Sequence, residues 1–167
     1  TVDKFGRPSQ RMVLLKDFGE HGFIFFTNLK SRKALEIICN NSVCLHFSWL
    51  SLDRQVVIQG SAALLSRDKV ENYFQGRPRT SQIGAWASRQ SEVITNRSVL
   101  EKRYSIIEQK FAQVEVPTPE FWGGYRVSLE RVEFWQGGKQ RLHDRFCYIP
   151  DGVNLTIPKW KIERLAP

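Results

Sequence analysis

Short apolar or alternating runs, separated by turn residues, recur along the chain and predict a protein rich in strands. The clearest alternation places Val132 and Phe134 on one face of a strand and Glu133 and Trp135 on the other. A Gly-Gly pair and a second apolar run, residues 146–149, follow, so this stretch predicts a β-hairpin. The other expected strands span residues 11–16, 23–27, 43–49, 54–65, 125–129 and 160–165.

Helical periodicity is clearest between residues 96 and 114, where apolar side chains recur at spacings of four and three. Ser98 and Glu101 have the spacing of a capping box at the start of this helix. The apolar stripe is expected to face the core or a subunit interface, and it consists of Leu100, Tyr104, Ile107, Phe111 and Val114. Shorter helices are expected over residues 31–40 and 66–76, and another one from Ser81.

Length and composition fit one domain. The 167 residues are 41% hydrophobic, enough for one core and short for two, so residues 1–167 are expected to form a single domain. Short antiparallel strands with interspersed helices predict an α+β protein whose sheet closes into a barrel. No apolar run approaches a membrane span and no signal peptide is visible, so we expect a cytoplasmic protein without membrane association. The chain starts at Thr1 instead of a methionine, so we expect it to lack a native N-terminal segment.

The charge balance adds an expectation about partners. Lys and Arg number 25 against 17 Asp and Glu, and the net charge of +8 favours a phosphorylated small molecule, nucleic acid or a membrane surface as partner. Cys39, Cys44 and Cys147 lie in apolar segments and lack the paired spacing of a zinc site, so buried free thiols and no metal are expected.

The return arm of the predicted hairpin carries Arg141, His143 and Arg145 at a spacing of two. On an extended strand this spacing points all three side chains to one face, where their mutual repulsion favours a bound anion or polarised ligand. The alternative is a solvated edge strand whose charges discourage aggregation. Trp135 on the partner strand favours a site for a planar ligand.

Two further places combine cations with hydrogen-bond donors. Ser31 is the expected N-cap of a helix whose next residues are Arg32 and Lys33, so amide N–H groups and two cations can bind a phosphate there; the alternative is two solvated charges. Farther along, a tyrosine, an arginine and a serine flank a corner set by a proline, where they form either a phosphate cradle or an ordinary corner network. These residues are Tyr73, Arg77 and Ser81.

Several long motifs then resemble one family. Arg-Met-Val-Leu-Leu-Lys (11–16), Thr-Asn-Leu-Lys-Ser-Arg-Lys (27–33), the segment 77–86, Phe-Trp-Gly-Gly (121–124), the hairpin 133–145 and the terminal Glu-Arg-Leu-Ala-Pro are together similar to the pyridoxine (pyridoxamine) 5′-phosphate oxidases. The resemblance implies an FMN-binding split β-barrel, antiparallel and Greek-key-like with flanking helices. It also implies a homodimer with FMN in two clefts between subunits. The implied reaction oxidises pyridoxine 5′-phosphate or pyridoxamine 5′-phosphate to pyridoxal 5′-phosphate, with O2 giving H2O2.

The resemblance also implies roles for individual residues. Those implied to contact FMN are Arg11, Met12, Val13, Leu14, Leu15, Lys16, Phe26, Thr27, Arg32, Lys33, Gln55, Gln90, Ser91, Trp135 and Arg145. Those implied to contact the substrate are Lys16, Tyr73, Arg77, Ser81, Arg141, Leu142 and His143. Arg141 and His143 would lie over the pyridine ring as the catalytic pair and handle the proton on the departing alcohol or amine.

Two alternatives come from other classes of protein. A nucleic-acid-binding barrel would explain the charge and the aromatic residues, but it would spread basic residues along a groove instead of gathering them at one helix start and one hairpin. A flavin-binding split barrel with another substrate would share the phosphate site without needing the Tyr73, Arg77 and Ser81 corner. The absorption spectrum of the purified protein distinguishes the flavin readings from the first alternative.

Overall fold

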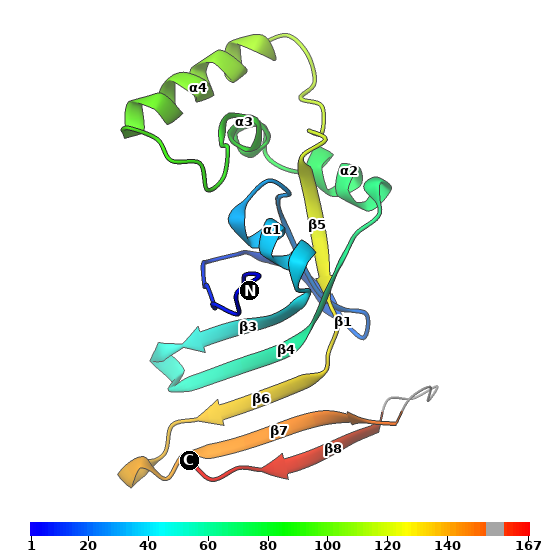
Figure 1. Ribbon diagram of the computed structural model, residues 1–167, viewed down its shortest axis with the longest axis vertical. Helices are drawn as coiled ribbons and strands as arrows, with labels where there is room; N and C mark the ends of the chain where they lie inside the picture. Colours follow the sequence, from blue (N-terminus) through cyan, green and yellow to red (C-terminus); the bar gives the residue numbers. More distant parts are fainter. Residues whose placement is uncertain (153–158) are drawn as a thin grey trace.

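The computed structural model describes residues 1–152 and 159–167. Helices are interspersed among the strands in this part of the chain, and every strand pairing is antiparallel (Figure 1). The elements are β1 (Leu15–Gly19), β2 (Gly22–Asn28), α1 (Arg32–Cys39), β3 (Ser42–Trp49), β4 (Arg54–Leu64), α2 (Arg67–Gln75), α3 (Arg79–Ala87), α4 (Arg97–Lys110), β5 (Trp122–Val127), β6 (Arg131–Gln136), β7 (Asp144–Asp151) and β8 (Lys159–Arg164). The predicted α+β class is confirmed.

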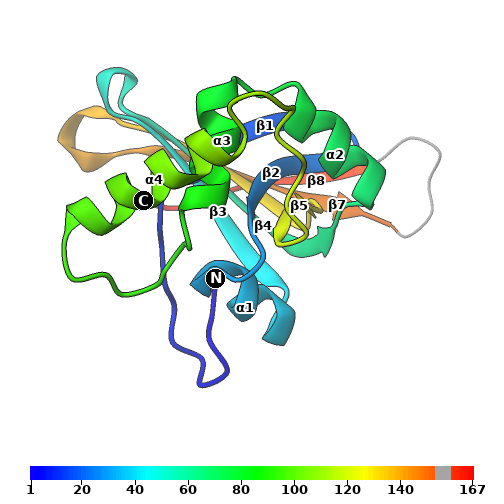
Figure 2. The ribbon, with the colours of Figure 1, turned by 90° about the horizontal axis from the view of Figure 1, so that it is seen from above.

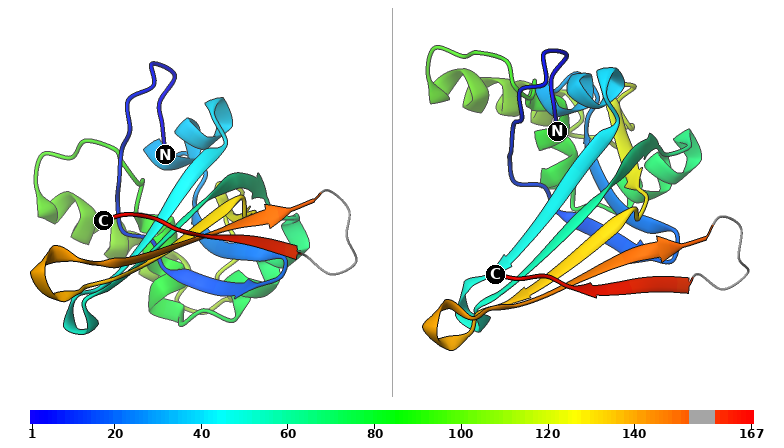
Figure 3. Two further views of the ribbon diagram at one scale, coloured as in Figure 1. Left: turned by 90° about the horizontal axis from the view of Figure 1, so that it is seen from below. Right: turned by 60° about the horizontal axis from the view of Figure 1, so that its bottom comes forward.

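The long strand β4 divides the sheet into two parts. The strand order is β1-β2-β5-β4-β6-β7-β8, and β3 also pairs with β4. Residues 54–59 pair with β6, whereas residues 62–64 pair with β5. Gly60 lies at this change of partner, where a Cβ atom would come within 1.7 Å of the Ser128 carbonyl oxygen. Only glycine permits this approach of two backbones, and Figure 3 shows β1, β2 and β5 turning away from β6–β8.

The part of the sheet that contains residues 54–59 of β4 together with β6, β7 and β8 has one apolar and one polar face, because side chains alternate along each strand. A buried cluster on the apolar face contains Val56, Ile58 and Val132. On the other face the strand register places Gln55 opposite Trp135, and Trp135 opposite Arg145. The predicted alternation of residues 132–135 is therefore confirmed. It brings one predicted ligand contact from each of three strands side by side.

The helices cover the other part of the sheet, which contains β1, β2 and β5, on two sides. In Figure 1, α2, α3 and α4 gather at the end where β5 begins, far from β6–β8, and Figure 2 shows α1 on the other side of the strands from α2 and α3. One core cluster joins β5 to α2, α3 and the end of α4. It contains Val70, Phe74, Ile83, Phe111 and Trp122. A second cluster packs α1 onto β2 and β5 through Ala34, Ile37, Phe25 and Tyr125. Among the described residues, no helix has the length and apolar character needed to cross a membrane.

Two expected helices are confirmed and two are corrected. Ser31 and Ser66 are the N-caps of α1 and α2, and Gly76 ends α2 as expected. Helix α3 begins at Arg79 and not at Ser81, because the carbonyl of its N-cap Pro78 accepts from the N–H groups of Ser81 and Gln82. The expected capping box of α4 is absent. Asn96 is its N-cap, the Ser98 hydroxyl donates to the Asn96 side chain, and Glu101 pairs with Arg97.

Burial and strand extent also differ from the sequence expectation. No residue within α4 is buried, and from its expected stripe only Phe111, just after the helix, is fully covered. Residues 11–14 lie outside the strands, since β1 begins at Leu15. Cys39 and Cys44 are exposed, and Cys147 is the one described cysteine that is buried.

Candidate functional site

The start of α1 holds a lysine ammonium among three oxygen acceptors. Lys33 Nζ donates to Thr27 Oγ1 at 2.9 Å, to Gln90 Oε1 at 3.1 Å and to Ser31 Oγ at 3.2 Å. Thr27 lies near the end of β2 and Gln90 follows α3, so three separate segments meet here. The Ser31 hydroxyl makes no capping bond and instead accepts from Lys33. Thr27, Lys33 and Gln90, three of the implied FMN contacts, therefore lie together.

A buried carboxylate joins two arginines beside this lysine. Glu36 is 6% exposed and accepts from Arg32 Nε at 2.7 Å through one oxygen and from Arg11 Nη2 at 3.2 Å through the other. The Arg32 backbone N–H donates to Ser91 Oγ at 3.1 Å, a second contact with the segment that contains Gln90. Arg11, Arg32 and Glu36 therefore form one network at the helix start, beside Lys33. We call these four residues the α1 cluster.

The environment shifts the pKa of two groups in the α1 cluster. Burial alone would raise the pKa of Glu36, but hydrogen bonds from Ser9, Thr1 and Arg32 outweigh it and lower the pKa to about 2. Burial, and next the charge of Arg11, lower the pKa of Lys33. Glu36 is therefore ionised at neutral pH. Arg11 and Arg32 contact Glu36, whereas Lys33 bonds only to neutral oxygens. The α1 cluster therefore holds three cations and one carboxylate, and the excess of two positive charges matches a phosphate monoester, which carries nearly two negative charges.

A second group of predicted residues lies at the ends of α2 and α3. The Tyr73 ring stacks on Phe26 of β2 with ring centroids 3.7 Å apart. The Arg77 guanidinium lies 4.5 Å from the centre of the Trp122 ring, and its buried Nη1 has no hydrogen-bond partner among the described residues. Ser81 is in the first turn of α3. A half-buried cation with an unused donor is suited to an anion.

The third group lies on the polar face formed by β4, β6 and β7. Arg145 Nε donates to Glu133 Oε1 at 2.8 Å, and Nη1 donates to the Ala166 carbonyl at 2.9 Å. The hydrogen bond to Glu133 raises the pKa of Arg145. Gln55 and Trp135 complete the group through the strand register. An aromatic ring, an amide and a guanidinium in adjacent strands suit a flat, polar-edged ligand.

Arg141 does not share a strand with Arg145, which corrects the sequence expectation. Strand β7 begins only at Asp144, and residues 139–141 form a short 3-10 helix. Gln140 and Arg141 have φ angles of 56° and 64°, a left-handed conformation that ends any extended run. The spacing-of-two argument assumed an extended chain, so it fails for this loop.

His143 also precedes the strand, but it lies beside the third group. Its ring contacts Trp135 with centroids 4.8 Å apart. Its Nδ1 accepts a hydrogen bond from the Gly138 N–H at 3.1 Å, so a neutral ring carries its proton on Nε2. Leu142, between the two predicted catalytic residues, is 70% exposed. The loop of residues 137–143 therefore carries Arg141, Leu142 and His143 beside the polar face.

The remaining predicted contacts lie on the segment that leads into β1. Met12 and Leu14 are largely exposed, Val13 packs partly against the core, and Leu15 opens β1. Lys16 is exposed and lies at an irregularity of the β1–β2 pairing. Figure 1 shows the β6–β7 loop at the opposite end of the molecule from α2 and α3. Apart from residues 12–16, the predicted residues of one chain thus fall into three separate groups.

Comparison with known proteins is decisive at this point. Residues 1–111 match the family described as pyridoxamine 5′-phosphate oxidase, and residues 122–167 match the pyridoxine 5′-phosphate oxidase C-terminal dimerisation region. The chain belongs to the pyridoxine/pyridoxamine 5′-phosphate oxidase family. The resemblance seen in the sequence motifs is confirmed, and the match to a dimerisation region supports a homodimer.

Relatives cover the whole of this chain. The pyridoxine/pyridoxamine 5′-phosphate oxidases of Cronobacter sakazakii and Sodalis glossinidius are 56% and 54% identical over 167 residues, all of this chain and 74% and 75% of theirs. The structure of PhzG from Burkholderia lata, in complex with tetrahydrophenazine-1-carboxylic acid, has a TM-score of 0.89 at 28% identity over all of this chain and 79% of that one.

A second solved structure supports the fold. A pyridoxamine 5′-phosphate oxidase-related, FMN-binding protein from Nostoc punctiforme has a TM-score of 0.75 at 15% identity, over all of this chain and 84% of that chain. The shared architecture extends from β1 to β8. The predicted split β-barrel is therefore confirmed.

Sequence reasoning missed three residues in these groups. Glu36 was detectable, because it lies four residues after Arg32 and so faces it on a helix. Glu133 was placed on the correct face without a role. Trp122 was part of a motif, but its contact with Arg77, 45 positions earlier, has no local signal in the sequence.

Proposed function

We propose that this chain is an FMN-dependent oxidase that converts pyridoxine 5′-phosphate or pyridoxamine 5′-phosphate into pyridoxal 5′-phosphate. O2 is the electron acceptor and H2O2 the second product; with pyridoxamine 5′-phosphate, water enters and ammonia leaves. Residues 1–167 act as one FMN-binding domain. The single observation that carries the proposal is the α1 cluster, whose excess of two positive charges suits a phosphate monoester in a chain of this family.

The residues present fit FMN. Arg32, Lys33 and Arg11 supply charged donors for its phosphate at the start of α1, where the helix dipole adds to the attraction. Gln55 and Trp135 would contact its ring system, with Arg145 held in place by Glu133. When bound, FMN supplies the two-electron chemistry by accepting the hydride and passing the electrons to O2.

The substrate phosphate is assigned to the corner between α2 and α3. Arg77 has an unused buried donor there, and Tyr73 and Ser81 add hydroxyl groups, with Lys16 as the second cation. These contacts hold a group remote from the reacting carbon, so they orient the substrate. Tyr73 stacks on Phe26, a proposed FMN contact, which supports a substrate site next to the cofactor site.

Proton handling falls to the loop before β7. His143 accepts from the Gly138 N–H at Nδ1, so Nε2 is the ring nitrogen left to exchange a proton with the alcohol or amine of the substrate. Arg141 supplies a fixed positive charge over the pyridine ring. The exposure of this loop in a single chain is consistent with a site completed by a second chain.

The proposed assembly is a homodimer in which each cleft is shared. One subunit provides the α1 cluster and the α2–α3 corner, and the other provides the polar face with Gln55, Trp135 and Arg145. This arrangement accounts for the separation of the groups within one chain, and it places β6–β8, part of the matched dimerisation region, at the contact. A two-fold contact completes both clefts at once.

The test combines three measurements on the purified chain. The absorption spectrum should show bound FMN, or FMN uptake on reconstitution. Pyridoxine 5′-phosphate should be consumed with equimolar H2O2, and sedimentation should show a dimer. A protein that cannot be loaded with FMN contradicts the proposal, and a monomer with full activity contradicts the shared cleft.

A further inference from the structure

Arg77 is fixed at its backbone by the end of α2. Its N–H donates to the Phe74 carbonyl at 3.1 Å, and Pro78 restricts its conformation from the other side. The side chain therefore leaves the corner in a defined direction.

The Arg77 guanidinium is packed on aromatic rings and has no acidic partner. It lies 4.5 Å from the Trp122 ring centre and 5.5 Å from that of Phe74. Nη1 is buried without a hydrogen-bond partner, and no carboxylate of the described residues forms an ion pair with Arg77. Burial lowers the pKa of Arg77, but a guanidinium stays protonated at any physiological pH. The rings thus stabilise a half-buried cation without consuming its donors.

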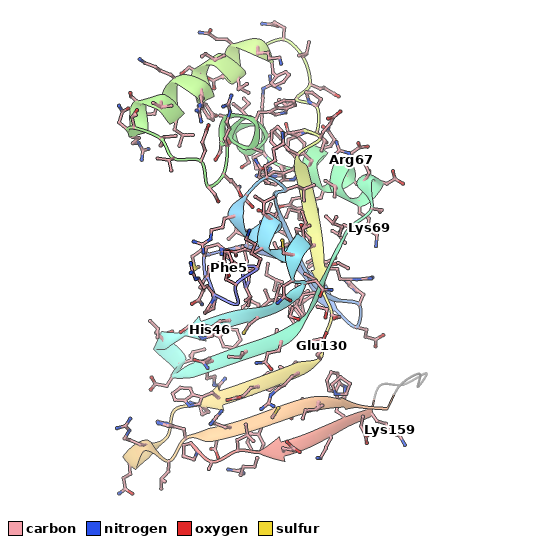
Figure 4. The ribbon with its side chains drawn as sticks, in the orientation of Figure 1. Phe5, His46, Arg67, Lys69, Glu130 and Lys159 are labelled. Carbon is pink, nitrogen blue, oxygen red and sulfur yellow. The ribbon has the colours of Figure 1, made fainter. Side chains whose placement is uncertain are left out.

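The aromatic platform is itself held rigidly. Trp122 is 6% exposed and Phe74 is fully buried, and their rings meet at 66° with centroids 6.0 Å apart. Arg67 of α2, labelled beside the upper end of β5 in Figure 4, donates to the Pro119 and Trp122 carbonyls at 3.1 and 3.3 Å. The position of the Trp122 ring is therefore set before any ligand arrives.

We propose that Trp122, supported by Phe74, is a positioning residue that holds Arg77 by a cation–π contact and leaves its donors free for the substrate phosphate. This inference rests on the proposed function, because it takes the ligand to be a phosphate monoester. A carboxylate in the place of the ring would neutralise the cation and compete with the phosphate. With the ring there, the incoming phosphate is the first full counter-charge that Arg77 meets, so the preference for phosphorylated substrates depends on Trp122.

The experiment compares Trp122→Leu and Trp122→Phe with the wild type. Leucine keeps apolar bulk without a π face, and phenylalanine keeps a smaller ring. For pyridoxine 5′-phosphate, kcat/KM should fall about tenfold in Trp122→Leu and less in Trp122→Phe, while the low activity on unphosphorylated pyridoxine should not change. Binding of 4-deoxypyridoxine 5′-phosphate, which lacks the reacting oxygen, should weaken by the same factors.

A double-mutant cycle separates positioning from packing. In the Arg77→Ala background, Trp122→Leu should cause no further loss for the phosphorylated substrate. Trp86→Leu is the matched control, because Trp86 packs against the same core cluster and does not contact Arg77. It should leave the ratio of the two specificity constants unchanged. If Trp122→Leu does not fold, the same cycle with Trp122→Phe decides the question.

Equal losses for both substrates, or a Trp122 effect that persists without Arg77, would overturn the inference and leave Trp122 a packing residue. These outcomes are distinct from failure of the proposed function. That failure would appear in the wild type, as an inability to oxidise pyridoxine 5′-phosphate, whereas the cycle can still be read from binding of the non-reacting analogue.

Discussion

Two regions of this protein are proposed to bind a phosphate, and they stabilise their cations in opposite ways. In the α1 cluster, Glu36 holds Arg11 and Arg32 through both of its oxygens. In the corner after α2, Arg77 rests on the Trp122 ring with a buried donor unused. The first arrangement keeps its cations in place with or without an anion, which suits a cofactor that stays bound. The second leaves its charge unpaired, which suits a substrate that enters and leaves at each turnover.

The largest expected effect concerns the α2–α3 corner, where Arg77 has no acidic partner among the described residues. Unphosphorylated pyridoxine should have a specificity constant at least about a hundredfold below that of pyridoxine 5′-phosphate, because charged hydrogen bonds contribute roughly 1.5–3 kcal/mol each. Since remote binding energy also orients the reacting carbon, kcat should fall together with the apparent affinity. Steady-state oxidation of both compounds measures the ratio, which should shrink in Arg77→Ala. Similar constants in the wild type would refute the assignment of Arg77, Tyr73 and Ser81 to the phosphate.

The next effect concerns retention of FMN by the α1 cluster. Arg32→Ala should weaken FMN binding by roughly 1.5–3 kcal/mol, about 10- to 150-fold in Kd, because a charged donor to the phosphate is lost. Fluorescence titration of the apoprotein with FMN measures this change. Arg97→Ala is a matched control, because Arg97 also opens a helix and pairs with a glutamate four residues later at 2.7 Å.

The hairpin loop should show the opposite behaviour. Arg141→Ala and His143→Ala should keep FMN and lose turnover, because both residues are assigned to the substrate side of the cleft. Flavin absorbance after gel filtration and steady-state rates measure the two properties on one sample. Loss of FMN from these variants as readily as from Arg32→Ala would show that the division between the regions is wrong.

The sequence was sufficient for those parts of the site that depend on local rules. Ser31 and Gly76 marked the correct ends of helices, although Ser31 makes no side-chain capping bond and Gly76 is not left-handed. The alternation around Trp135 gave the correct face of β6. The loop before β7 could not be predicted, because Arg141 adopts a left-handed conformation that spacing arguments do not foresee.

Contacts distant in sequence were equally out of reach. Arg11 and Glu36 are 25 residues apart, and they meet only because α1 packs beside the segment that leads into β1. Trp122 reaches Arg77 only because β5 runs against α2. The family motifs supplied the residues, while the way in which each cation is stabilised required the structure.

A smaller effect should follow from removing the negative charge of the α1 cluster. Glu36→Gln should destabilise the apoprotein by about 1–3 kcal/mol, because Arg11 and Arg32 lose a buried ionic partner. Added FMN should then raise Tm more in this variant than in the wild type, since the phosphate replaces the missing charge. Thermal unfolding with and without FMN measures both the stability of the apoprotein and the increase in Tm caused by FMN. Glu101→Gln, in an exposed pair of the same spacing, should change stability by less than about 0.5 kcal/mol.

The smallest effect is a dependence of apoprotein stability on pH that comes from the same carboxylate. The pKa of Glu36 is about 2 in the folded chain and near the ordinary value of 4.5 in the unfolded chain. The folded pKa is the lower one, so the unfolded state binds more protons; this contribution to stability is complete above pH 4.5 and is lost as the pH falls toward 2. Between pH 5 and pH 4 the loss should be under about 1 kcal/mol. Chemical unfolding of the wild type and Glu36→Gln at both pH values isolates the contribution of Glu36 to the pH dependence of the free energy of unfolding. If the two proteins lose stability equally on acidification, Glu36 does not carry the charge that the α1 cluster requires.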